Sequence, residues 1–246
     1  MPKRKNFSPT KKQLEELAVS PNPRNILDRW EITIEELTEL VDKNPSLRGV
    51  LLGYIAEMKL RNLWFSTERI THAIKYDDHD RKKKGDLVIT YSDKSFIVES
   101  KSLQTNSIRI EETPTGIRYK GKAQCDASDR RIIALPDGSE INTTCLLVGE
   151  FDLLAVNIFA FENSWRFIFA KNSDLPRSNY AKYTEAQRQY LLASLITVTW
   201  PPEPPFYAEP FRLLDEIAEA RDRKGVTPAI VNHERIEIVD ESGDAD

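Results

Sequence analysis

The spacing of apolar residues predicts that the chain begins with helices. Six apolar residues recur at helical spacing after Asn44-Pro45-Ser46, which supplies a cap and a first-turn proline. They are Leu47, Val50, Leu51, Tyr54, Ile55 and Met58. Shorter helices are expected over residues 11–18 and 34–41.

After residue 65 the pattern becomes extended. Strands are expected over residues 69–76, 87–91 and 95–101, and Ser92-Asp93-Lys94 between the last two is typical of a hairpin turn. Residues 104–143 carry P-T-G and P-D-G turn signals and should form strands and loops.

The second half of the chain predicts a buried hairpin followed by helices. The apolar run over residues 145–161 is expected to pair with residues 165–170. A helix over 184–196 should begin at a Thr-x-x-Gln cap and end at the proline-rich TWPPEPPF connector, and another helix is marked by apolar residues over 211–218. Together these elements predict an α/β fold with a mixed central β-sheet flanked by helices.

The same pass along the chain predicts one folded domain with polar ends. We expect a flexible basic segment over residues 1–22, a domain over 23–221 and a polar, acidic tail over 222–246.

Composition narrows the class of protein. In 246 residues, 40% are hydrophobic and 30% charged, which is typical of a globular domain with a sizeable core. The net charge of −4 provides no global attraction for nucleic acid, so binding would require a local basic patch. Two cysteines are too few for a disulfide framework or zinc cluster, and no apolar run reaches membrane-spanning length. We therefore expect a cytoplasmic protein that does not contact membranes.

Candidate chemistry lies in the predicted hairpin over 87–101. Because residues two apart share a face of a strand, Glu99 and Lys101 lie on one face of a segment that is apolar on both sides. Such charges are costly unless they pair or bind something. The hairpin would bring Asp86 beside them. Two carboxylates suit Mg²⁺, for which Mn²⁺ can substitute, and a neighbouring lysine can position a water, which together indicate metal-assisted hydrolysis of a phosphodiester.

The order Asp86, twelve further residues and then Glu99-Ser100-Lys101 resembles the core motif of the PD-(D/E)xK nuclease superfamily. The resemblance implies a restriction-endonuclease-like fold and a Mg²⁺-dependent endonuclease acting on DNA in restriction or phage defence. The metal ligands would be Asp86 and Glu99, together with Glu57 on the helix that precedes the first strand. Lys101 would position the water. It also implies a homodimer. Two departures are Gly85 before the aspartate, where the family often has proline, and the polar segment after Lys101, where it usually has a helix.

Further polar residues near this motif have two interpretations each. The run Arg81-Lys82-Lys83-Lys84 is either a solvated loop or a phosphate clamp. Gln124 is a candidate supporting residue of the site and Lys122, on the same face, a candidate nucleic-acid contact, or both belong to a polar surface strand. The Glu99–Lys101 pair itself has a simpler interpretation as a salt bridge on an edge strand. Glu150 and Asp152 are expected to be structural, with Arg166 as their candidate partner.

Two other functions stay open from the sequence. The chain is either an active nuclease or a nuclease-like module that binds nucleic acid or a protein without cutting. Alternatively it is a nuclease subunit that is active only within a larger defence complex. RNA is not excluded as the substrate.

Overall fold

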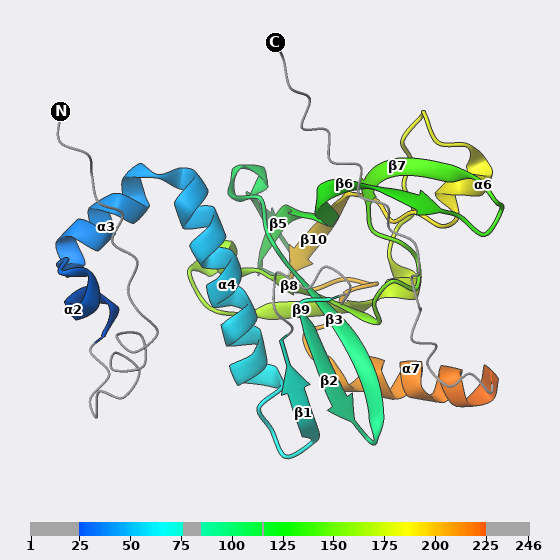
Figure 1. Ribbon diagram of the computed structural model, residues 1–246, viewed down its shortest axis with the longest axis horizontal. Coiled ribbons are helices and arrows are strands. Elements are labelled where there is room, and N and C mark those ends of the chain that lie inside the picture. The colour runs from blue at the N-terminus through cyan, green and yellow to red at the C-terminus, as the bar shows by residue number, and fades with distance from the viewer. Residues whose placement is uncertain (1–24, 76–84, 115, 225–246) are drawn as a thin grey trace, which may run out of the picture. The chain divides into compact units, whose positions relative to one another are not determined.

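The computed structural model of this chain describes residues 25–75, 85–114 and 116–224 (Figure 1). The chain divides into two compact units, residues 1–51 and 52–246, with the boundary inside helix α4 (Pro45–Trp64). The helix predicted over residues 11–18 lies outside the described residues, and the predicted domain limits near residues 22 and 222 stay predictions.

The first unit is helical. It contains α2 (Ile26–Trp30), α3 (Ile34–Lys43) and the first turns of α4. Thr33 and Glu36 form a capping box at the start of α3, in which each side chain accepts the backbone N–H of the other residue. Both helices predicted from apolar spacing in this region are confirmed.

A five-stranded mixed sheet organises the second unit. Its order is β1-β2-β3-β8-β9, and every neighbouring pair is antiparallel except β3 and β8, which are parallel. The strands are β1 (Ile70–Ile74), β2 (Leu87–Tyr91), β3 (Lys94–Ser102), β8 (Leu153–Asn157) and β9 (Phe167–Lys171). The predicted hairpin of β2 and β3 is confirmed, and its turn residues Ser92 and Asp93 both have positive φ. The expected mixed α/β fold with flanking helices is likewise confirmed.

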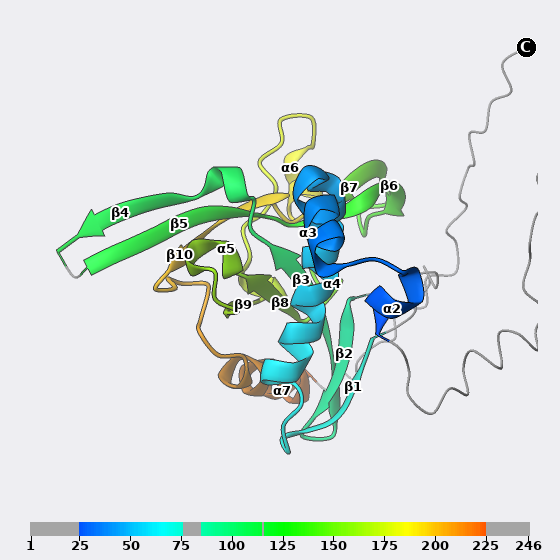
Figure 2. The same ribbon diagram turned by 90° about the vertical axis from the view of Figure 1, so that its left-hand side faces the viewer.

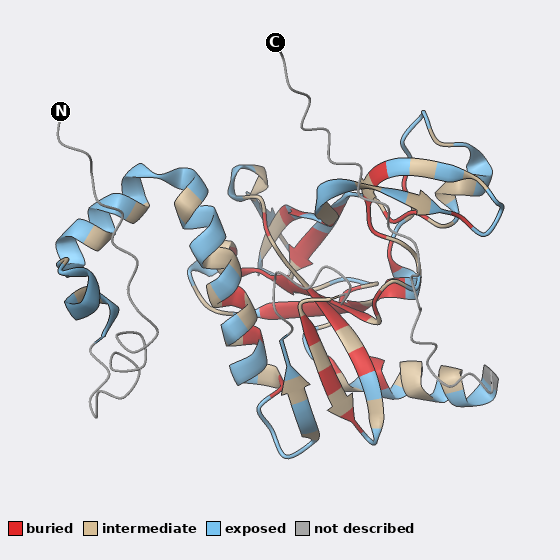
Figure 3. Ribbon diagram, in the orientation of Figure 1, coloured by how far each residue is buried: buried red, intermediate tan, exposed pale blue. Residues whose placement is uncertain are grey.

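Most of this sheet is buried (Figure 3), and apolar side chains pack against both of its faces. On one face, Leu60 of α4 and Leu213 of α7 (Phe211–Lys224) pack in the same cluster as Val98 of β3. On the other face, residues of β8 and β9 pack against a smaller sheet. Burying one such side chain stabilises a fold by about 1.5–3 kcal/mol. The apolar packing on both faces of the sheet therefore fixes β3 in place.

The smaller sheet has three strands in the order β10-β5-β4, and a separate hairpin joins β6 to β7. The strands are β4 (Arg109–Thr113), β5 (Gly116–Gln124), β6 (Asp126–Ala134), β7 (Glu140–Cys145) and β10 (Leu195–Trp200). Four strands and the 3₁₀ turn Thr105–Ser107 therefore stand between β3 and its parallel partner β8, where the PD-(D/E)xK family usually has a helix.

The helix predicted over residues 184–196 is wrong beyond its first turn. Thr184 and Gln187 do form the expected capping box, but α6 extends only over Glu185–Arg188. Leu191 and Leu192 are then buried in isolated bridges to Leu147 and Arg177. Residues 196–199, Ile-Thr-Val-Thr, alternate apolar and polar side chains and form part of strand β10. They adopt this extended form because the backbone of β5 pairs with them.

The predicted hairpin over residues 145–170 is confirmed in pairing but shorter than expected. β8 and β9 pair antiparallel and are almost wholly buried. The helical turn α5 (Phe159–Glu162) occupies part of the expected strand, and the chain reverses at Asn163, whose φ is +51°. In the part of the chain that the structure describes, no helix is long and apolar enough to cross a membrane.

Gly85, two residues before the start of β2, provides a test of this packing. Its φ is +81°, and a Cβ at this position would lie 2.2 Å from Cγ2 of Ile97. We expect Gly85→Ala to lower the free energy of unfolding by about 2–4 kcal/mol, from left-handed strain plus overpacking. Gly138→Ala is the matched control, since its φ is also +81° but no atom lies within 4 Å of the added Cβ. Urea unfolding should show a loss of only about 1 kcal/mol there, and equal losses would contradict the steric argument.

Candidate active site

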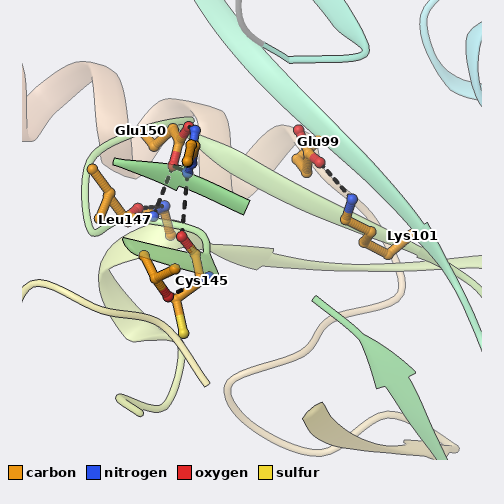
Figure 4. Close-up of polar contacts among 8 residues, drawn as sticks. Glu99, Lys101, Cys145, Leu147 and Glu150 are labelled. Atoms are coloured by element: carbon orange, nitrogen blue, oxygen red, sulfur yellow. Dashed lines mark hydrogen bonds and ion pairs between the residues drawn. The ribbon is translucent and has the colours of Figure 1, made fainter. Parts of the chain in front are cut away.

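The Glu99–Lys101 pair lies on the middle strand of the central sheet, not on an edge strand. Lys101 Nζ lies 2.8 Å from Glu99 Oε1, and Glu99 is only 9% exposed (Figure 4). In the parallel register, Glu99 is opposite Leu154 and Lys101 is opposite Val156 of β8, both fully buried. The predicted shared face is therefore confirmed, and it is the face covered by the smaller sheet.

Asp86 is held against the same strand by two backbone contacts. Its N–H donates to the carbonyl of Val98 at 3.1 Å, and its Oδ2 accepts the N–H of Ser100 at 2.7 Å. These bonds continue the β2–β3 pairing in which Leu87 is opposite Val98. The hairpin thus places Asp86 beside the Glu-Ser-Lys segment, as the spacing predicts.

Electrostatic coupling links the three groups. Burial and, to a smaller extent, the negative charge of Asp86 raise the pKa of Glu99 to about 7, against the attraction of Lys101. Burial lowers the pKa of Lys101, but the charges of Glu99 and Asp86 together outweigh this effect and leave that pKa above its ordinary value. The lysine therefore stays protonated at neutral pH while the glutamate is close to its titration point.

Glu57 lies in a different part of the site. It pairs with Lys75, the residue after β1, and both line a cavity of about 100 Å³ on the α4 side of the sheet. Asp86 and Ser100 line this cavity as well, whereas Glu99 and Lys101 do not. The structure thus brings Glu57 together with Asp86, and Asp86 together with Glu99 and Lys101.

A metal ion fits this donor set in part. Among residues 25–75, 85–114 and 116–224, no group of three or more His, Cys, Asp or Glu side chains is arranged to hold one. Mg²⁺, however, keeps several waters and is commonly bound through one or two carboxylates. Asp86 and Glu99 supply two such oxygen donors, and their mutual repulsion favours a cation near them.

The predicted supporting residues lie at the end of β5. Gln124 Oε1 accepts a hydrogen bond from Gln104 Nε2 at 3.0 Å, and the neighbouring Ala123 bridges to Leu103, two residues after Lys101. Lys122 and Gln124 are both exposed. The predicted phosphate clamp Arg81-Lys82-Lys83-Lys84 lies outside the described residues.

Sequence reasoning did not connect Cys125 or Glu150 with the buried pair. Cys125 interacts electrostatically with Lys101 and Glu99, and burial raises the pKa of its thiol to about 12. Glu150 influences the pKa of Glu99, and it pairs with Arg131 while accepting the N–H of Leu147 at 2.8 Å (Figure 4). No local pattern predicts these influences on Glu99, because the residue after β5 and the loop before β8 come near β3 only in the folded chain.

The expected structural role of Glu150 and Asp152 agrees with their contacts, but the candidate partner Arg166 is wrong. Arg166 pairs with Glu162, four residues away. Asp152 pairs instead with Arg221 of α7 and accepts the N–H of Ile97 at 2.8 Å. It therefore anchors β3 to the C-terminal helix.

Comparisons with known proteins provide no relative for this chain. No protein-family model, curated protein or solved structure matches it.

Titration of Glu99 should make the stability of the fold depend on pH. Because its pKa is raised from 4.5 to about 7, the folded state holds this proton more tightly than the unfolded chain between those values. The resulting stabilisation is complete below the lower value and is lost as pH rises through the higher one, a fall of about 3 kcal/mol in the free energy of unfolding. Denaturant unfolding across this window measures it.

Two variants identify the titrating group. Glu99→Gln should lack this fall, and an equal fall in the variant would assign it to another residue. In Lys101→Met the pKa of Glu99 should rise further, because the attraction that lowers it is removed, so the fall should extend to higher pH.

Proposed function

We propose that this protein is a divalent-metal-dependent endonuclease that hydrolyses phosphodiester bonds of DNA. The observation that carries the proposal is the buried Glu99–Lys101 pair on the central strand, with Asp86 fixed beside it by the backbone of the same strand. A buried ion pair contributes little net stability, so a chain that keeps one in its central sheet has a use for those charges. The order of the residues also resembles the PD-(D/E)xK nucleases.

Asp86 and Glu99 would hold Mg²⁺ or Mn²⁺ through their carboxylate oxygens. Such an ion polarises a phosphate oxygen and lowers the pKa of a bound water. Lys101 would contribute positive charge rather than act as a base, because its raised pKa keeps the ammonium protonated. It would orient the attacking water and offset the negative charge that develops on the phosphate.

The setting of this activity follows the resemblance. We propose a restriction-endonuclease-like protein of the cytoplasm that acts in restriction or phage defence, as a homodimer or within a larger complex. Cleavage of both strands of a duplex requires two such sites, which a two-fold dimer supplies.

A second candidate is a nuclease-like module that binds nucleic acid without cutting it. The observation that favours it is the pairing of Glu57 with Lys75, which leaves two carboxylates rather than three beside Lys101. Metal-dependent cleavage distinguishes the two functions.

The first test is cleavage of plasmid DNA with Mg²⁺. We expect Asp86→Ala and Lys101→Ala to lower the cleavage rate at least about 100-fold, and a chelator to abolish cleavage. Lys94→Ala is the matched control, because Lys94 begins the same strand and forms an ion pair with Asp222. Appearance of nicked and linear plasmid on a gel measures the rate. If wild type is inert but binds DNA equally with and without Mg²⁺, the second candidate is correct.

The second test concerns Glu57. If this residue helps to hold the ion, Glu57→Gln should raise the Mg²⁺ concentration for half-maximal cleavage by about tenfold, the magnitude seen when metal-site carboxylates lose their support. Lys75→Gln removes the same ion pair but no carboxylate and should not raise this concentration. Equal effects of the two variants would restrict Glu57 to a structural role.

A further inference from the structure

Near β10, the three-stranded sheet β10-β5-β4 has one side buried in the core and one outward face. Ala123 of β5 and Ile196 and Val198 of β10 point into the core. Alternate residues must therefore point outward, and the register places Thr197 opposite Lys122 and Arg109 opposite Lys120 on that side. We define the basic face by its outward charged and amide residues: Arg109, Glu111, Arg118, Lys120, Lys122 and Gln124.

This face is cationic on a chain with a net charge of −4. It carries four cationic side chains and one acid, Glu111. Neither Arg109 nor Lys122 forms an ion pair with any residue that the structure describes, and both are exposed. Lys120 lies 3.9 Å from Glu111 and its side chain is 45% exposed, whereas Arg118 pairs with Glu203. Three cations of the face are thus available to a ligand.

The basic face begins next to the candidate active site. Gln124 is hydrogen-bonded to Gln104, which follows Lys101 by only three residues. In extended chain this separation is roughly 10 Å. From there the cationic residues follow β5 toward the tip of the β4–β5 hairpin, which extends away from the five-stranded sheet (Figure 2). A ligand lying along β5 would therefore meet, at its Gln124 end, the chain segment that follows Lys101.

We propose that the basic face binds the backbone of double-stranded DNA and directs it to the candidate active site. This inference rests on the proposed function, which it extends from the cutting residues to the surface that holds the substrate. Two geometric observations favour a duplex. Successive cations along β5 are two residues apart, about 7 Å, which is close to the axial rise of two base pairs. A projecting two-stranded ribbon is also one of the shapes that the major groove of DNA admits.

The experiment measures binding without cleavage. A fluorescent DNA duplex is titrated with the full chain in the presence of a chelator, and anisotropy is recorded over a series of salt concentrations. In Arg109→Gln/Lys120→Gln/Lys122→Gln, affinity should fall about tenfold or more, and the slope of log affinity against log salt should decrease in magnitude by about 3, one per lost phosphate contact. The control Arg29→Gln/Lys182→Gln/Arg223→Gln removes the same charge from exposed residues elsewhere and should bind as wild type.

Two additions keep the result decisive. Circular dichroism shows whether the triple variant folds. If it does not, Arg109→Glu on the edge strand β4 replaces it and should also weaken binding. Equal losses in the triple variant and its control would overturn the inference, since net charge alone would then account for the effect. Tighter binding to an RNA duplex than to DNA would overturn DNA as the partner.

Failure of this inference is distinguishable from failure of the proposed function. If wild type cuts plasmid but the triple variant binds and cuts equally well, the basic face is overturned and the nuclease stands. If the triple variant loses DNA binding while wild type never cuts, the basic face stands and the endonuclease is overturned.

Discussion

The double burial of β3 is the constraint on which the rest of the structure depends. This strand hydrogen-bonds to β2 on one side and β8 on the other, and apolar clusters cover both of its faces. Any charged side chain within it must therefore find a partner inside the fold, because removing one member of a buried pair costs about 3–5 kcal/mol. Glu99 and Lys101 satisfy this requirement with each other, and each shifts the pKa of its partner toward the charged form.

The position of Asp86 beside β3 depends on the close packing of Gly85 against this strand. Gly85 adopts a left-handed conformation against Ile97, so that the chain enters β2 with the Asp86 carboxylate turned toward the backbone of β3. Two carboxylates and an ammonium then share a small, poorly solvated region. Such an arrangement is more informative about function than a surface salt bridge, because its charges remain only partly neutralised.

Much of the fold could be predicted because its signals are local. Helical spacing identifies α3 and α4, and the Asn44-Pro45-Ser46 signal locates the start of α4. Parity along residues 96–101 places Glu99 and Lys101 on one face, and the Ser92-Asp93 turn brings Asp86 back to them. The helix predicted over 184–196 was wrong because its cap is real but its continuation is decided by β5, whose strand recruits residues 195–200.

By itself, the sequence determined the elements, the shared face of the charged pair and the spacing of Asp86, since each follows from a period of two or 3.6 residues and a short turn. Only the tertiary structure decided that β3 is central, that Glu57 pairs with Lys75 on the α4 side, and that Cys125 and Glu150 interact electrostatically with Glu99. It also decided that four strands lie along the chain between β3 and β8, which are neighbours in the sheet. Cationic side chains of two of these strands, β4 and β5, share an outward face. These features depend on contacts between segments far apart in the chain, and burial between such segments has no local pattern.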